Sequence, residues 1–298
     1  LEARARGERV LVVCADPADV PRLAQEMPWF EPKLDVRPLP DWETLPYDVL
    51  SPQEELVSER LEALYRLTAP TGGADVLLTS AVTASQRLSP VSYIGANTFF
   101  FHQGEQISLT TLQKRLAAAG YANVKQVLAA GEFAVRGSIV DVFPMGSERP
   151  FRLDFFDDEI ESIRWFDVDT QRSMESAEEI RLLPGHEFPV DPEALLAFRQ
   201  RWRREFAGDP KKSIVYCDIE KEILPPGIEY YLPLFFDETA ALTDYLPPNA
   251  RVFLLGDIEV ALQAFGRDMA SRYKVLAADP QRPALAPERI WLKPEEFF

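Results

Sequence analysis

The alternation of apolar and polar positions is densest between Gly131 and Arg172. Three runs there are rich in β-branched and aromatic residues: Ser138–Phe143, Phe151–Phe156 and Ile160–Phe166. Short turns separate them, and the second turn is the acidic sequence Asp157-Asp158-Glu159. The pattern predicts a three-stranded antiparallel meander.

The second run has a strict period of two. Side chains of a strand point alternately to its two faces, so one face carries Phe151, Leu153 and Phe155. We expect this face to be core. The other carries Arg152, Asp154 and Phe156. The pattern therefore leaves a phenylalanine between charged neighbours, on the face expected to meet water.

The rest of the chain has the pattern of an α/β protein, in which buried strands alternate with amphipathic helices. The predicted buried strands are Val10–Cys14, Ala74–Ser80, Ser213–Asp218, Ile228–Phe236 and Arg251–Gly256. The predicted helices are Ser51–Leu67, Thr110–Gly120, Pro192–Phe206 and Ile258–Tyr273. Four prolines between Pro38 and Pro52 predict an ordered, extended loop, in which packing is favoured over binding as the role of Trp42.

These elements suggest an α/β domain that is split by an inserted α+β domain. We expect the first half of the α/β domain at residues 1–98, the insert with the meander at 99–184, and the second half at 185–298.

The composition excludes several classes of function. The 298 residues carry a formal charge of −16, which argues against binding of nucleic acid over the whole surface but leaves a local basic patch open. No apolar run is long enough to cross a bilayer, so we expect a soluble, cytoplasmic protein. Cys14 and Cys217 are far apart without metal-ligand spacing, and we expect both to be buried, reduced thiols.

Motifs for catalysis are missing from the sequence. A phosphate-binding loop needs G-x-x-x-x-G-K-[ST], yet no lysine here follows a glycine. His102 and His186 are isolated, and neither G-x-S-x-G nor H-E-x-x-H occurs. Asp157-Asp158-Glu159 could hold Mg²⁺, but a solvated turn is the favoured interpretation. We therefore predict no catalytic, cofactor-binding or metal-ligating residue.

The water-facing side of the meander is different, because Arg152 and Phe156 place a guanidinium beside an aromatic ring. Such pairs are enriched at protein interfaces, and Arg136 precedes the first strand, where it could join them. In the alternative interpretation, Phe156 packs under a helix of the insert and both arginines pair with nearby acids. The pattern does not decide between the two.

Three segments carry a resemblance to a known family. They are LPDWETLPYDVLSPQEELVSERLEALYRL (39–67), GEFAVRGSIVDVFPMGSERPFRLDFFDDEIESIRWFDVDTQRS (131–173) and LPGHEFP (183–189). The chain resembles the N-terminal region of bacterial transcription-repair coupling factors, which is similar to the excinuclease B module with its domains 1A, 2 and 1B. We therefore expect it to be part of a longer protein.

The resemblance implies a degenerate, helicase-like α/β domain without ATP binding and an insert that recruits excinuclease A to stalled RNA polymerase. It assigns the excinuclease A contacts to Arg136, Arg152 and Phe156. It also implies that RNA polymerase and duplex DNA bind regions absent here, and that a C-terminal domain of the parent covers the same face. The alternative is a residual DNA-binding or nucleotide-hydrolysing module of the excinuclease B type.

Overall fold

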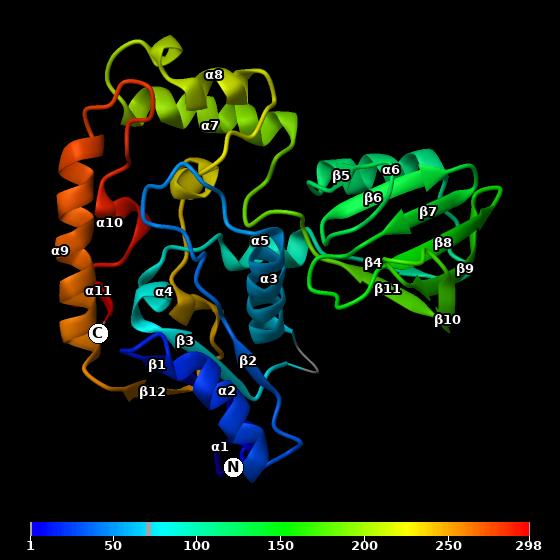
Figure 1. Cartoon of the computed structure of the whole chain (residues 1–298), viewed down its shortest axis with the longest axis horizontal. Coiled ribbons are helices and arrows are strands. Elements are labelled where there is room, and N and C mark those ends of the chain that lie inside the picture. Colours follow the sequence, from blue (N-terminus) through cyan, green and yellow to red (C-terminus); the bar gives the residue numbers. More distant parts are fainter. Residues whose placement is uncertain (1, 70–72, 298) are drawn as a thin grey trace. The chain divides into compact units, whose positions relative to one another are not determined.

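The chain folds into two units, which are described separately below. The computed structural model describes residues 2–69 and 73–297 (Figure 1). The first unit comprises residues 1–52, 63–91 and 192–298, and the second comprises 53–62 and 92–191. The α/β class predicted from the sequence is confirmed, since the first unit contains a parallel sheet flanked by helices.

The sheet of the first unit has four parallel strands in the order β12-β1-β3-β2. These strands are β1 (Val10–Cys14), β2 (Val36–Pro38), β3 (Val76–Ser80) and β12 (Arg251–Leu255). The central strands β1 and β3 are apolar on both faces and buried, as predicted, because helices and loops of a parallel sheet cover both faces.

Helices form most of the remainder of the first unit. They are α1 (Glu2–Ala5), α2 (Asp19–Phe30), α4 (Ala81–Ser85), α7 (Pro192–Glu205), α8 (Ile214–Glu220), α9 (Ile258–Leu276), α10 (Pro287–Ile290), α11 (Pro294–Phe297) and the 3₁₀ helices η1 (Pro210–Lys212), η2 (Ile228–Leu234) and η3 (Leu242–Tyr245). Two further helices contribute residues to both units, α3 (Glu54–Thr68) and α5 (Val91–Ala96).

Two predicted strands of the first unit are wrong. Ser213–Asp218 begins α8 instead, because the Ser213 hydroxyl accepts a hydrogen bond from the backbone N–H of Tyr216 and so caps a helix. Ile228–Phe236 forms η2, whose Pro233 has no N–H to donate to a strand ladder. Arg251–Gly256 does contain a strand, β12, but its predicted burial is wrong, since it lies exposed at the edge of the sheet.

The proline-rich segment is an ordered loop, as predicted. Trp42 is buried in it and meets Tyr230 edge to face at 5.4 Å, so its packing role is confirmed. The helix predicted from Ser51 begins only at Glu54, because the Ser51 hydroxyl instead bonds Gly227 N–H and the Glu229 carboxylate.

The cysteines only partly follow the prediction. Cys14 and Cys217 are both free thiols. Cys14 is buried in β1, as expected, but Cys217 in α8 is only half-buried, so its predicted burial is wrong.

The second unit is built on a six-stranded sheet in the order β10-β9-β8-β7-β6-β5. Its strands are β5 (Ala122–Asn123), β6 (Glu132–Arg136), β7 (Ile139–Val142), β8 (Phe151–Phe156), β9 (Glu159–Phe166) and β10 (Ser173–Ala177). A separate antiparallel pair, β4 (Phe99–His102) and β11 (Glu179–Leu182), and helix α6 (Leu109–Ala118) complete the unit.

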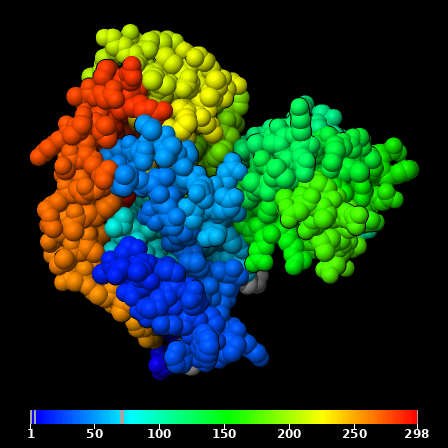
Figure 2. Space-filling view, in the orientation of Figure 1, coloured from blue at the N-terminus to red at the C-terminus, as the bar shows by residue number. Residues whose placement is uncertain are grey.

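The predicted meander is confirmed as β7, β8 and β9, paired antiparallel. Pattern reasoning missed that β6 and β10 extend it on either side. The predicted faces are also right: in β8, Phe151, Leu153 and Phe155 are buried, while Phe156 is exposed. The strands of this sheet belong to the green part of Figure 2. The sheet thus buries one face as core and leaves part of the other open.

Candidate interaction surface

Neighbouring phenylalanines at the end of β8 have opposite environments. Phe155 is 6% exposed and lies on the core face, whereas Phe156 is 68% exposed on the other face. β9 pairs with β8 from Phe151 to Phe156, and β7 pairs with it as far as Asp154, beyond which Phe155 N–H is donated to the Ser138 carbonyl. Phe156 does not pack under a helix, so that part of the alternative interpretation is wrong. Its other part, the pairing of both arginines with a nearby acid, is confirmed, since both pair with Asp141.

Two tight turns lie beside the end of β8 that carries Phe156. Gly137 lies in the two-residue turn between β6 and β7 with φ +62°, and a Cβ atom there would meet no atom within 4 Å. Gly is suited to this turn because it adopts positive φ without steric cost. On the other side Asp157, at φ +53°, begins the turn from β8 to β9.

A buried carboxylate pairs with two arginines on the face of the sheet that carries Phe156. Asp141 in β7 is 1% exposed and lies opposite Arg152 in the register. Arg152 donates Nε–H to Asp141 Oδ1 at 2.7 Å and its terminal N–H to Oδ2 at 3.0 Å, a bidentate pair. This hydrogen bonding raises the pKa of Arg152.

Arg152 is held by further contacts and is mostly covered. It donates to the Gln171 carbonyl at 3.2 Å and the Ser173 hydroxyl at 3.1 Å, and its guanidinium lies 5.0 Å from the Phe166 ring centre. Its side chain is 13% exposed. Arg152 therefore presents only a small part of its surface to solvent.

Arg136 completes the group from the end of β6. It also pairs with Asp141, yet 47% of its side chain remains exposed. Arg136, Arg152 and Phe156 thus lie on one face of one sheet, with the arginines joined through Asp141 and Phe156 free in solvent. We call Arg136, Arg152, Phe156 and Asp141 the β8 surface.

Asp141 was missed by sequence reasoning. It stands among apolar residues in the predicted strand Ser138–Phe143. A single acid inside an apolar strand is the signal that could have found it, since a carboxylate is rarely fully buried without a charged partner.

The other residues considered for chemistry lie apart from this surface. His102 is exposed beside Glu179, 3.3 Å away, and burial lowers the pKa of His186, which stacks on Phe188, to about 4. Asp157, Asp158 and Glu159 form the turn after β8. Across residues 2–69 and 73–297, no group of three or more His, Cys, Asp or Glu side chains is placed to hold a metal ion.

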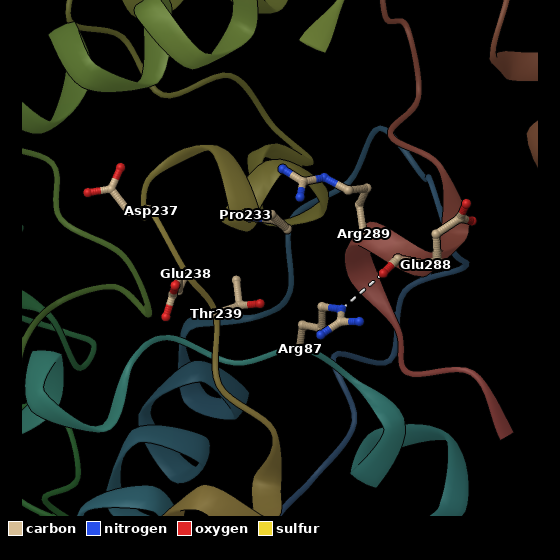
Figure 3. Close-up of a pocket in the computed structure, with 7 residues that line it drawn as sticks. All are labelled: Arg87, Pro233, Asp237, Glu238, Thr239, Glu288 and Arg289. Atoms are coloured by element: carbon tan, nitrogen blue, oxygen red, sulfur yellow. Dashed lines mark hydrogen bonds between the residues drawn. The ribbon is translucent and has the colours of Figure 1, made fainter. Parts of the chain in front are cut away.

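A polar pocket of about 350 Å³ lies in the first unit (Figure 3). Its lining consists of Arg87, Pro233, Asp237, Glu238, Thr239, Glu288 and Arg289. Arg87 donates to the Glu288 carbonyl at 2.9 Å, and Arg289 lies 3.5 Å from Glu205. Its arginines are thus engaged by acceptors of the protein itself, and it contains no histidine or cysteine for catalysis.

The segment after β1 is where a phosphate loop would lie in a nucleotide-binding α/β fold. Here Asp16 accepts a hydrogen bond from Ala18 N–H at 2.9 Å, and Asp19 stands in the first turn of α2. Asp19 pairs with Arg22 at 2.6 Å, so the Asp16 carboxylate is the charge at this helix start that repels a phosphate group.

The described part of the chain also contains no helix with the length and apolar character that crossing a membrane requires.

Comparison with known proteins matches the second unit to a defined family. Residues 99–188 match the UvrB interaction domain, and this range contains all of the β8 surface. The match supports an interaction role for this part of the chain.

Similarity to whole proteins extends over almost the entire chain. The transcription-repair-coupling factor of Escherichia coli K12 is 42% identical over 290 residues, which cover 97% of this chain and 25% of that protein. Those of Haemophilus influenzae and Bacillus subtilis are 45% and 32% identical over 265 and 216 residues. The chain spans about a quarter of the length of the first two of these relatives, and the resemblance seen in the sequence is confirmed.

Proposed function

On the premise that this chain is a relative of the transcription-repair-coupling factors with a UvrB interaction domain, we propose that it is a non-catalytic protein-interaction module. Its task is to recruit excinuclease A to stalled RNA polymerase through the β8 surface. The protein performs this role in the bacterial cytoplasm. In the longer protein, RNA polymerase and duplex DNA bind other regions, and a C-terminal domain covers the β8 surface until recruitment.

The exposure of Phe156 is the observation that carries this proposal. A phenylalanine that is 68% exposed on a strand with a neighbour on each side gains nothing for the fold, but its burial in a pocket of a partner is favourable. Binding energy at interfaces concentrates in a few such aromatic and arginine anchors. Phe156 is therefore the proposed anchor, and it lies inside the matched family range.

The two arginines have different proposed roles. Arg136 is half exposed and can contact an acidic or carbonyl group of excinuclease A at the rim of the interface. Arg152 is largely covered and bonded to Asp141, so it contributes a small contact and mainly holds the carboxylate that orients Arg136. Asp141 is a positioning residue in this scheme.

We also infer that the parallel-sheet unit is a degenerate helicase-like domain, split as proposed into residues 1–98 and 185–298. The absence of a phosphate loop from the sequence and the carboxylate of Asp16 at the start of α2 support this inference. The proposed insert, 99–184, falls within the second unit.

The rival proposal, a DNA-binding or nucleotide-hydrolysing module, finds less support. The net charge is −16, and two of the four arginines of α7 lie near acids of the same unit: Arg201 pairs with Asp237, and Arg199 lies 3.9 Å from Glu220. Phosphate binding requires free, clustered cations. Measurement of ATP turnover and of duplex binding by the purified chain would revive this rival if either exceeded background.

The decisive experiment measures the affinity of the chain for purified excinuclease A by biolayer interferometry. Phe156→Ala should weaken binding by roughly 30-fold, corresponding to the approximately 2 kcal/mol expected for a hot-spot aromatic. Phe100→Ala is the matched control, because Phe100 is also an exposed phenylalanine of the second unit, but in β4. Equal affinity of wild type and Phe156→Ala would overturn the proposed surface.

A further inference from the structure

Arg164 of β9 is an exposed arginine on the face of the sheet that carries Phe156. It lies directly opposite Arg152 of β8 in the strand register. Side chains of residues that pair across antiparallel strands point to the same face, so Arg164 lies beside the β8 surface. The same row of the sheet has Asp141 next to Arg152 and Ser176 next to Arg164.

No acid of the described residues balances the charge of Arg164. Both carboxylate oxygens of Asp141 already accept hydrogen bonds from the arginines of the β8 surface. Asp154, which is diagonal to Arg164 in the register, accepts the hydroxyl of Ser162 instead. Within the part of the chain that the structure describes, the Arg164 side chain thus makes neither an ion pair nor a hydrogen bond.

Two arginines that face each other across neighbouring strands cost stability. Their Cβ atoms lie about 5 Å apart in such a pair, and like charges at this distance repel. Arg152 is fixed by its two hydrogen bonds to Asp141, and only 13% of its side chain is exposed. Arg164 therefore opposes the fold slightly, while its guanidinium keeps its N–H donors for another molecule.

A carboxylate of another molecule is the group that fits this position. A planar guanidinium binds a carboxylate through two parallel hydrogen bonds, and the negative charge also offsets the repulsion between Arg164 and Arg152. Arg152 stands four residues before Phe156 in β8, which is about 13 Å along a strand. Arg164 and Phe156 therefore fit within one interface of standard size, about 800 Å² on each partner.

We propose that Arg164 binds an aspartate or glutamate of excinuclease A, beside the pocket that takes Phe156. This inference rests on the function proposed above and adds the chemistry of the partner: an apolar pocket with an acidic side chain about 13 Å away. Because Arg164 is exposed, its charge should act mainly on the rate of association, which attraction between opposite charges increases.

Biolayer interferometry with purified excinuclease A at low and at high salt tests the role of Arg164. Arg164→Glu should weaken binding by roughly 10-fold at low salt, mainly through slower association, and by less at high salt, because ions screen exposed charges. Lys114→Glu is the matched control, since it makes the same change in charge at an exposed position of α6. It should change the affinity by less than about two-fold.

Urea unfolding separates a binding role of Arg164 from a structural one. The midpoint of Arg164→Glu should equal or exceed that of the wild type, because an opposite-charge pair replaces a repulsive one. If Phe156→Ala weakened binding while Arg164→Glu bound like Lys114→Glu, this inference would be overturned and the proposed function would stand. Unchanged affinity in all three variants would overturn both.

Carbodiimide coupling identifies the group that Arg164 contacts. In Arg164→Lys, the amine at position 164 should form an amide with an aspartate or glutamate of excinuclease A, which mass spectrometry of the cross-linked peptides locates. Lys114 of the same sample is the internal control, because it is exposed in α6. Amides from position 114 as abundant as those from position 164 would contradict the proposed contact.

Discussion

β8 and β12 both expose apolar side chains to solvent, but in different ways. β8 has a neighbour on each side and a buried core face, so that Phe156 is its one exposed large apolar side chain. Within the described residues β12 has one neighbouring strand, β1, so that one edge of its backbone and four apolar side chains are exposed.

The difference shows which kind of partner each strand can accept. A single side chain on a rigid, paired strand suits a pocket on a preformed surface, as in an anchor residue of a protein interface. An open edge suits another strand, because main-chain hydrogen bonds supply the contact. In the proposal made above, the strand with less exposed apolar surface, β8, is the one that binds a partner protein.

The largest predicted contrast lies between adjacent residues of β8. Phe155→Ala should lower the free energy of unfolding by about 3–5 kcal/mol, because it leaves a cavity in the core of the second unit. Phe156→Ala should change it by less than about 0.5 kcal/mol, as expected for an exposed side chain. Urea unfolding followed by circular dichroism measures both. Similar losses would mean that Phe156 is structural.

The corresponding contrast for β12 uses residues in register. Leu11→Ala should destabilise the first unit by about 2–5 kcal/mol, since Leu11 is buried in the sheet. Val252→Ala should cost less than about 1 kcal/mol. A large loss from Val252→Ala would show that the edge is covered within the chain.

Asp141→Ala should destabilise the second unit by about 2–3 kcal/mol, because it removes the carboxylate that pairs two arginines. It should also weaken excinuclease A binding through Arg136. Asp154→Ala is the control. Asp154 lies in β8 on the same face of the sheet as Asp141, and among the described residues its side chain accepts a hydrogen bond from Ser162 and not from an arginine. If both variants lost the same stability, Asp141 would have no special role.

Lowering the pH should reduce the stability of the second unit more than that of the first, because both histidines belong to the second. Burial lowers the pKa of His186 to about 4 in the folded state, below the ordinary value of 6.5. The unfolded state then binds more protons between these values, so stability is full above pH 6.5 and falls as pH drops toward 4, by roughly 1–3 kcal/mol.

Hydrogen exchange at pH 7 and pH 5 measures the protection of backbone amides in each unit separately. Amides of β8 and β9 should lose protection at pH 5, after correction for intrinsic rates, whereas those of β1 and β3 should change less. In His186→Gln the specific loss in β8 and β9 should disappear. A loss that persists in this variant would assign the pH dependence to other groups.

Sequence patterns predicted the parts of this molecule in which one rule dominates. The alternation in Phe151–Phe156 gave the right faces because one face is core and the other is not. Ser213–Asp218 was mistaken for a strand because a short apolar run fits a strand or a buried helix, and its capping serine was the better signal.

The site was predictable only in part. Phe156 could be placed on the open face from period two alone, but the pairing of Arg136 and Arg152 depends on Asp141, which reaches them across strands. Contacts between strands depend on register, which a local pattern does not give. The exposure of β12 was missed for the same reason, since its order in the sheet depends on the whole fold.

Site-specific photo-cross-linking tests the central claim most directly. A benzophenone side chain at position 156 of the chain, mixed with excinuclease A and irradiated, should give a covalent complex, whereas the same group at position 100 should give little. This is the result predicted if Phe156 is the anchor. A cross-link from position 100 as strong as that from position 156, or none from 156, would contradict the account.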